Sequence, residues 1–135
     1  MKVLFFTYLA VLCSYLLLDF IWLGLVSQSS YQEAIGYLMR DTLPRWPWIA
    51  FYLMYSFVVV KIVIAPLVNQ SSKHAFINGA CLGLAAYGAY NLTNYAILKG
   101  WPIQITLIDW VWGTLVSAII SWVGFRVNAK LRNVG

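Results

Sequence analysis

The chain has 135 residues, of which 62% are hydrophobic and 10% charged, and its mean hydropathy is +0.77. This composition excludes a soluble domain of this length and indicates an integral membrane protein. The net charge of +5 comes from Lys and Arg residues that form no basic stripe, so no nucleic-acid partner is expected. The two cysteines lie in apolar runs without a second Cys or His at ligand spacing, which predicts neither a disulfide nor a zinc site.

The first apolar segment runs from about residue 3 to 26, which is long enough for a helix to cross a bilayer. It follows Lys2 and resembles a signal peptide, but it contains Asp19 and lacks a small-x-small cleavage site, so we expect a retained helix. Residues 30–33 then read Ser-Tyr-Gln-Glu, the pattern of a capping box. This pattern predicts a short helix over about 31–39 that lies in the outer membrane–water interface.

Three further apolar segments of spanning length follow, at about 48–68, 75–98 and 102–127. Pro47 and Pro102 suit the first turn of a helix, where a missing N–H group costs nothing. Three tryptophans beside them are expected at the depth of the lipid headgroups: Trp46, Trp48 and Trp101. The sequence therefore predicts an all-α membrane protein with a single domain over 1–135, a bundle of four transmembrane helices with the interfacial helix in the first loop.

An even number of spans places both termini on the same side of the membrane. The positive residues expected on that side are Lys2, Lys73, Arg126, Lys130 and Arg132. The positive residues expected on the opposite side are Arg40, Arg45 and Lys99, and Glu33 and Asp41 partly offset them. The positive-inside rule then predicts that the termini are cytoplasmic.

Two aspartates lie deep inside otherwise apolar segments. A charged residue at the centre of a membrane helix costs roughly 2.5–3.5 kcal/mol on insertion scales, so each aspartate should have a partner or a function. Asp19 lies about six or seven residues before the outer end of the first span, and Asp109 about seven residues after the outer start of the fourth. At about 1.5 Å per residue, both carboxylates are expected roughly 10 Å below the same interface.

The second and third spans bring further polar groups to this level. The third span carries polar residues at i, i+3, i+4 and i+7, which places them on one helix face: Tyr87, Tyr90, Asn91 and Asn94. Tyr52 and Tyr55 of the second span lie at a comparable depth. All four spans are therefore expected to point polar or aromatic groups toward one pocket in the outer half of the bundle.

Lys61 and the small residues allow other interpretations of the buried polar groups. Lys61 lies near 20 Å from the outer end of the second span, so it is expected to snorkel to the inner interface, with pairing to an aspartate as the alternative. The polar cluster could serve only as interhelical hydrogen-bond glue, at about 0.6 kcal/mol per contact. Small residues four apart, Gly79 with Gly83 and Gly113 with Ser117, predict close helix packing. Neutral side chains would serve as glue without the insertion cost of two carboxylates, which favours a functional site.

Four sequence blocks resemble the bacterial membrane protein family named domain of unknown function 2177. They are LDFIWLG at 18–24, YGAYNLTN at 87–94, KGWP at 99–102 and DWVWGT at 109–114. The resemblance implies a four-helix protein of the bacterial inner membrane with no established activity. The family usually carries an aspartate where this chain has Asn91, which weakens a cation site built from three acidic ligands. The candidate ligand-binding or proton-relay residues are Asp19, Asp109, Asn91, Asn94, Tyr87, Tyr90, Tyr55, Trp22 and Trp112.

Two carboxylates in one apolar pocket would repel each other, and one protonated acid beside one ionised acid suits acid–base chemistry or proton transfer. The first hypothesis is a pocket that binds, or helps to modify, a lipid-like or amphipathic molecule. The alternatives are a proton- or cation-coupled transporter or channel that acts as an oligomer, and an accessory subunit of a membrane complex. Enzymatic activity stays open, and no metal or cofactor is expected. The expected partners are membrane lipids and either a second copy of the chain or a membrane partner protein.

Overall fold

The computed structural model describes residues 1–26 and 28–134. Helices make up its regular structure, in the order α1 (Lys2–Ile21), the π-helical continuation η1 (Trp22–Val26), α2 (Gln28–Ile35), the 3-10 turn η2 (Gly36–Leu38), α3 (Trp46–Val58), the π-helical continuation η3 (Val59–Ile64), α4 (Ser72–Ile97) and α5 (Ile103–Val134). The predicted all-α fold with a short helix in the first loop is confirmed.

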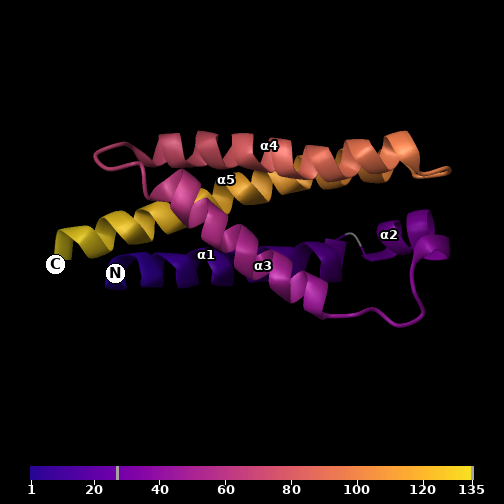
Figure 1. Cartoon of the computed structure of the whole chain (residues 1–135), viewed down its shortest axis with the longest axis horizontal. Coiled ribbons are helices and arrows are strands. Elements are labelled where there is room, and N and C mark those ends of the chain that lie inside the picture. The colour runs from indigo at the N-terminus through magenta and orange to yellow at the C-terminus, as the bar shows by residue number, and fades with distance from the viewer. Residues whose placement is uncertain (27, 135) are drawn as a thin grey trace.

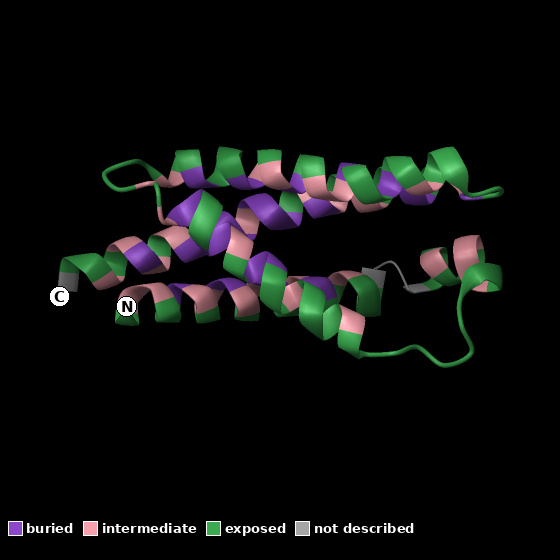
Figure 2. Ribbon diagram, viewed as in Figure 1, coloured by how far each residue is buried: buried purple, intermediate pink, exposed green. Residues whose placement is uncertain are grey.

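Within the described residues, three stretches of helix are long and apolar enough to cross a membrane: Lys2–Leu25, Trp46–Ile64 and Ile103–Asn133. The remaining long helix, α4, has 26 residues and a more polar sequence, and it lies along α5 (Figure 1). Many large apolar residues are exposed, and Phe20 is 72% exposed. Exposed residues recur along the outer faces of the helices (Figure 2). An exposed apolar surface of this extent suits contact with lipid. The prediction of a four-helix membrane bundle is confirmed.

The two ends of the bundle differ in what they carry. Both termini and the α3–α4 connection lie at one end, which we call the termini end (Figure 1). The short helix α2 and the α4–α5 connection lie at the other end, which we call the α2 end. This arrangement is expected when four consecutive long helices run in alternating directions.

Helices α4 and α5 meet along a seam of small residues. A Cβ atom added to Gly83 would lie 2.6 Å from Ser117 Cβ, and one added to Gly79 would lie 2.6 Å from Ser121 Cβ. At such distances only glycine allows the two backbones to approach. The predicted close packing of the small-residue steps is confirmed, and it takes place within one chain.

Helix α1 packs on the other side of α5. Near the termini end, Asn128 Nδ2 donates a hydrogen bond of 2.9 Å to Thr7 Oγ1, and a Cβ on Gly124 would overlap Val11. The buried apolar cluster between α1, α3, η3 and α5 comprises Val11, Tyr15, Tyr55, Val59, Val60, Ile64, Val116 and Ile120. This cluster sets the spacing of the helices that carry the polar groups above it.

Helix α3 crosses the bundle obliquely (Figure 1). Among the described residues, α3 packs against α1 and its own continuation, while η3 packs against α1, α4 and α5. The continuation η3 therefore packs among the other helices at the termini end, and α3 lies farther from α4 toward the α2 end. This divergence leaves room for cavities at the α2 end.

Several local expectations need correction. α2 begins at Gln28, so Ser30 and Glu33 lie inside the helix and do not form a capping box at its start. Pro47 lies in the first turn of α3 as predicted, whereas Pro102 precedes α5 and its carbonyl accepts the Thr106 N–H at 3.2 Å. The π-helical segments were not predicted, because no apolar pattern distinguishes them from an α-helix. Lys61 is exposed on η3, at the termini half of its span.

Candidate functional site

Asp19 lies on the one buried face of α1. The buried residues of this helix follow one another at intervals of four, which is the spacing of a single helix face. They are Thr7, Val11, Tyr15 and Asp19. Asp19 Oδ2 accepts a hydrogen bond of 2.8 Å from Tyr52 Oη, and Oδ1 accepts one of 2.8 Å from Trp112 Nε1. The carboxylate, which is 8% exposed, thus joins α1 to α3 and α5.

Asp109 joins the remaining helices in the same way. Its Oδ1 accepts a hydrogen bond of 2.6 Å from Tyr31 Oη, and its Oδ2 accepts one of 2.6 Å from Asn91 Nδ2. Asn91 is fully buried on α4, and its Nδ2 also lies 3.0 Å from the Tyr87 carbonyl oxygen. Each of the five α-helices therefore contributes at least one residue to a network around the two aspartates.

The two carboxylates are close enough for their charges to interact. They are also connected through α5, because Asp109 and Trp112 are three residues apart and share a helix face. Trp112 stacks on Trp22 of η1, with ring centroids 4.5 Å apart and an interplanar angle of 5°. This stack holds the Trp112 indole in the orientation that directs its N–H toward Asp19.

Tyr87 and Tyr55, two of the predicted site residues, lie in a separate layer. Tyr87 precedes Asn91 by one helical turn, and its hydroxyl bonds that of Tyr15, which precedes Asp19 by one turn. Tyr55 packs edge-on to Tyr87 at 6.2 Å and shares a hydrogen bond of 2.7 Å with Ser117 Oγ. These tyrosines form a layer on the termini side of the aspartates, and the Tyr55 hydroxyl bonds Ser117 and not an aspartate, so the role of Tyr55 as a site residue stays a prediction.

Tyr90 and Asn94 lie at the edge of the network. Tyr90 is exposed and packs edge-on to Trp101, with ring centroids 6.1 Å apart at 87°. Asn94 is half-buried and does not line the cavities described below. Trp101, expected at the lipid headgroups, is only 9% exposed and packs inside the α2 end. Trp46 and Trp48 are exposed, as expected of residues at an interface.

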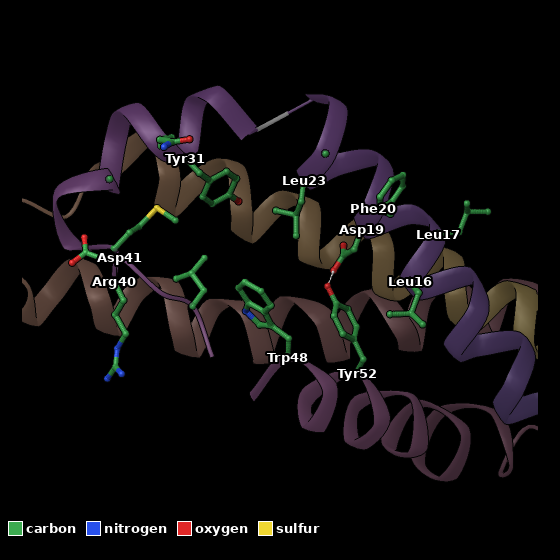
Figure 3. A pocket seen from close by; sticks show the side chains of 15 residues that line it. Leu16, Leu17, Asp19, Phe20, Leu23, Tyr31, Arg40, Asp41, Trp48 and Tyr52 are labelled. Atoms are coloured by element: carbon green, nitrogen blue, oxygen red, sulfur yellow. Dashed lines mark hydrogen bonds between the residues drawn. The ribbon is translucent and has the colours of Figure 1, made fainter. Parts of the chain in front are cut away.

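The largest cavity has a volume of about 1190 Å³ and lies between α1, η1, the first loop and the start of α3 (Figure 3). Its apolar wall is built by Leu16, Leu17, Phe20 and Leu23. Asp19 and Tyr52 both line this cavity, and the hydrogen bond that joins them lies at its wall. Arg40 and Asp41 line its end at the first loop. The cavity thus changes from apolar to polar and charged toward the α2 end.

A second cavity of about 440 Å³ adjoins the first and reaches Asp109. The two cavities share the lining residues Leu23, Tyr31, Met39, Trp48 and Tyr52. A third cavity, of about 320 Å³, lies where α3 diverges from α4 and shares Trp48 and Tyr90 with the second. Trp48, on α3, therefore borders all three.

Tyr31 and Tyr15 are network residues that the sequence did not single out as site residues. Tyr31 lies in the segment predicted only to form the interfacial helix, and Tyr15 lies in a continuous apolar run, so no pattern in the sequence marks either of them. Burial, and then the nearby Asp109 charge, raise the pKa of the Tyr31 phenol above its ordinary value of 10.0. Tyr52 was placed at the right depth, but its partner could not be inferred from spacing along one helix.

The chemistry of the network is that of hydrogen-bonded carboxylates. No group of three or more His, Cys, Asp or Glu side chains that could hold a metal ion occurs in the part of the chain that the structure describes. Cys13 and Cys81 are free and exposed. The Asp19 and Asp109 oxygens accept bonds from two phenols, an indole and an amide, so each oxygen has a fixed direction for any further contact.

Neither a curated protein nor a solved structure matches the chain. A family described as "Predicted membrane protein (DUF2177)" matches residues 4–126, a stretch that includes Asp19, Asp109 and all their hydrogen-bond partners. The multi-pass helical bundle described above agrees with this description. The chain therefore belongs to the DUF2177 family of predicted membrane proteins.

Proposed function

We propose that this protein binds a lipid-like or amphipathic molecule in the large cavity beside Asp19 and holds it for modification or for transfer to a partner. The observation that carries the proposal is the gradient along that cavity, whose wall is leucine and phenylalanine around the Asp19–Tyr52 hydrogen bond and charged at its far end, where Arg40 and Asp41 lie (Figure 3). Ligand sites are typically apolar with a few placed polar groups. An amphipathic molecule matches this gradient, with its chain along α1 and its polar part toward the α2 end.

Access from the lipid phase follows from the exposure of the cavity wall. Leu17 and Phe20 line the cavity and are themselves well exposed on the outside of the bundle. A chain can therefore enter sideways from the surrounding acyl chains without first crossing water.

The test is retention of amphiphiles by purified protein. We expect native mass spectrometry of the protein released from mild detergent to show a bound amphiphile in the wild type. Asp19→Asn should reduce the bound fraction, and Leu17→Trp should reduce it by filling the cavity without touching the hydrogen-bond network. Glu33→Gln, which removes an exposed carboxylate that does not line the cavity, is the matched control. Equal retention by all four proteins would contradict the proposal.

We also propose that the protein lies in a bacterial inner membrane with its termini in the cytoplasm. The support is the concentration of Lys2, Lys73, Arg126, Lys130 and Arg132 in segments at the termini end. Fusions of a periplasm-active enzyme and of a cytoplasm-active fluorescent protein to the C-terminus test this orientation. Activity of the periplasmic reporter would contradict it.

A second candidate function is proton- or cation-coupled transport, which the close pair of carboxylates within the membrane favours. The glycine steps of α4 and α5 are occupied within the chain, so an oligomer would have to form through another surface. Proteoliposomes loaded with a pH-sensitive dye test this candidate. Proton or sodium flux that Asp19→Asn and Asp109→Asn do not change would count against it.

A further inference from the structure

We infer that the ligand of this protein carries a cationic head group, an alkylated ammonium, and that this group occupies the second cavity beside Asp109. The inference rests on the proposed function and names the class of its ligand. The first cavity would hold the apolar chain. The second, which adjoins it, would hold the charge.

The walls of the second cavity have the composition of an ammonium site. Aromatic side chains from four different helices or connections surround it, namely Tyr31, Trp48, Tyr52, Tyr90 and Trp101. The faces of such rings attract cations, and aromatic cages are the common recognition element for quaternary ammonium groups. The volume of about 440 Å³ leaves space for a substituted ammonium and the first atoms of its chain.

The polar groups of this cavity also select a positive charge. Asp109 accepts hydrogen bonds of 2.6 Å on both oxygens, and one of the donors, Asn91 Nδ2, can only donate. Carboxylate oxygens that accept hydrogen bonds also attract a cationic group. No Lys, Arg or His occurs among the described residues that line the second cavity. An anionic head group would meet the Asp109 charge without a compensating cation.

The path between the two cavities is continuous. Tyr31, Trp48 and Tyr52 line both cavities. Leu23 also lines both, so the apolar wall of the first cavity continues into the aromatic wall of the second. The one cation that lines the first cavity, Arg40, is followed directly by Asp41, which offsets its charge. Nothing in the first cavity therefore favours an anionic head group over a cationic one.

The experiment compares probes that share a twelve-carbon chain and differ only in head group. Wild-type protein in nanodiscs is titrated with dodecyltrimethylammonium, dodecyl glucoside and dodecyl phosphate, and binding is followed by native mass spectrometry. We expect the ammonium probe to bind at least about tenfold more tightly than the uncharged probe, as a desolvated cation–aromatic contact allows. The phosphate probe should bind most weakly.

Variants then locate the preference. Tyr90→Leu should reduce the ammonium preference about threefold or more and leave the uncharged probe unchanged. Tyr95→Leu, an exposed tyrosine of the same helix that does not line the cavity, is the matched control. Asp109→Asn should bring the ammonium and uncharged probes to near parity. Because Asp109→Asn also changes the hydrogen bonds to Tyr31 and Asn91, the comparison of Tyr90→Leu with Tyr95→Leu tests the inference independently.

The outcomes separate this inference from the function on which it rests. Equal binding of the ammonium and uncharged probes overturns the cationic ligand and leaves the amphiphile site standing. Failure of every probe to bind the wild type overturns both. Lysophosphatidylcholine, added as a fourth probe, distinguishes the sources of the ammonium. Binding lost in Tyr90→Leu supports a lipid headgroup, and absence of binding beside a bound dodecyltrimethylammonium supports a free cationic amphiphile.

Discussion

Helices α4 and α5 meet along a seam of glycine and serine, whereas the cavity between α1, η1, the first loop and the start of α3 is lined by leucine and aromatic side chains. In the seam, backbone lies against backbone and no side chain can be added. At the α2 end of α1 and α3, the same bundle leaves about 1190 Å³ unfilled. Both regions lie within one short chain, so their difference in packing comes from the types of residue in each region and not from the size of the protein.

The two regions hold the two aspartates differently. Asn91 and Asp109 lie on α4 and α5, the two helices that meet along the seam. Asp19 and Tyr52 lie on α1 and α3, and the hydrogen bond that joins these helices lies at the wall of the first cavity. Trp112 connects the two regions by donating from α5 to Asp19. Asp109 is therefore held on the closely packed side of the bundle, and Asp19 lies beside the cavity.

The largest expected effect comes from filling the seam. The Cβ atom of the valine in Gly113→Val would already overlap the Tyr87 ring, so no rotamer of the new side chain avoids the clash. We expect a loss of about 3 kcal/mol or more in the free energy of unfolding, measured by denaturant titration in mixed micelles.

The matched control is Gly24→Val, because a Cβ at Gly24 meets no atom within 4 Å. We expect this variant to remain within about 0.5 kcal/mol of the wild type. Similar losses at both glycines would show that the seam is not tighter than the cavity side.

The next largest effect compares the two aspartates. Asp109→Ala removes the acceptor of fully buried Asn91 and should cost about 1–3 kcal/mol in unfolding free energy. Asp19→Ala should cost less, because the Tyr52 phenol that it leaves lies at a cavity wall where a ligand or water can replace the carboxylate. The same denaturant titration measures both. A larger loss for Asp19→Ala would show that the hydrogen bonds on the cavity side contribute more to stability than those on the seam side.

Smaller effects are expected from the individual phenols. Tyr31→Phe and Tyr52→Phe each remove one hydrogen bond to an aspartate and keep the ring. Each should cost about 0.6 kcal/mol, the usual value for an interhelical hydrogen bond in a membrane protein. A double-mutant cycle with Asp109→Asn should show coupling for Tyr31 and none for Tyr52. Coupling of Tyr52 to Asp109 would mean that the two aspartates form a single unit.

The smallest effect is a dependence on high pH. Burial and the Asp109 charge raise the pKa of Tyr31 in the folded state above 10.0, so the unfolded chain releases this proton first as the pH rises. The stability that Tyr31 contributes is complete below a pH of about 10 and decreases above it. Thermal unfolding across this range should show a shallower decrease for Tyr31→Phe than for the wild type. An unchanged slope would mean that the short helix has separated from α5.

Much of the fold could be read from patterns along the chain. Apolar length identified the four long helices, and the interval of four between small residues identified the seam, because both signals act within a single helix. The common depth of Asp19 and Asp109 followed from counting residues from the interface. The sequence did not identify Tyr31 as a partner of Asp109, because that bond joins residues 78 positions apart on helices whose rotation is set by packing.

Composition and spacing were thus sufficient for a four-helix membrane protein with two carboxylates that need partners. The assignment of those partners required the three-dimensional arrangement. Asp19 could have faced any of the phenols at its depth, and the oblique path of α3 brings Tyr52 to it while Tyr55 turns toward Ser117. The cavities have the same origin. The first lies between α1, η1, the first loop and α3, and the third lies where α3 diverges from α4, so both depend on how separate helices pack and on no local pattern.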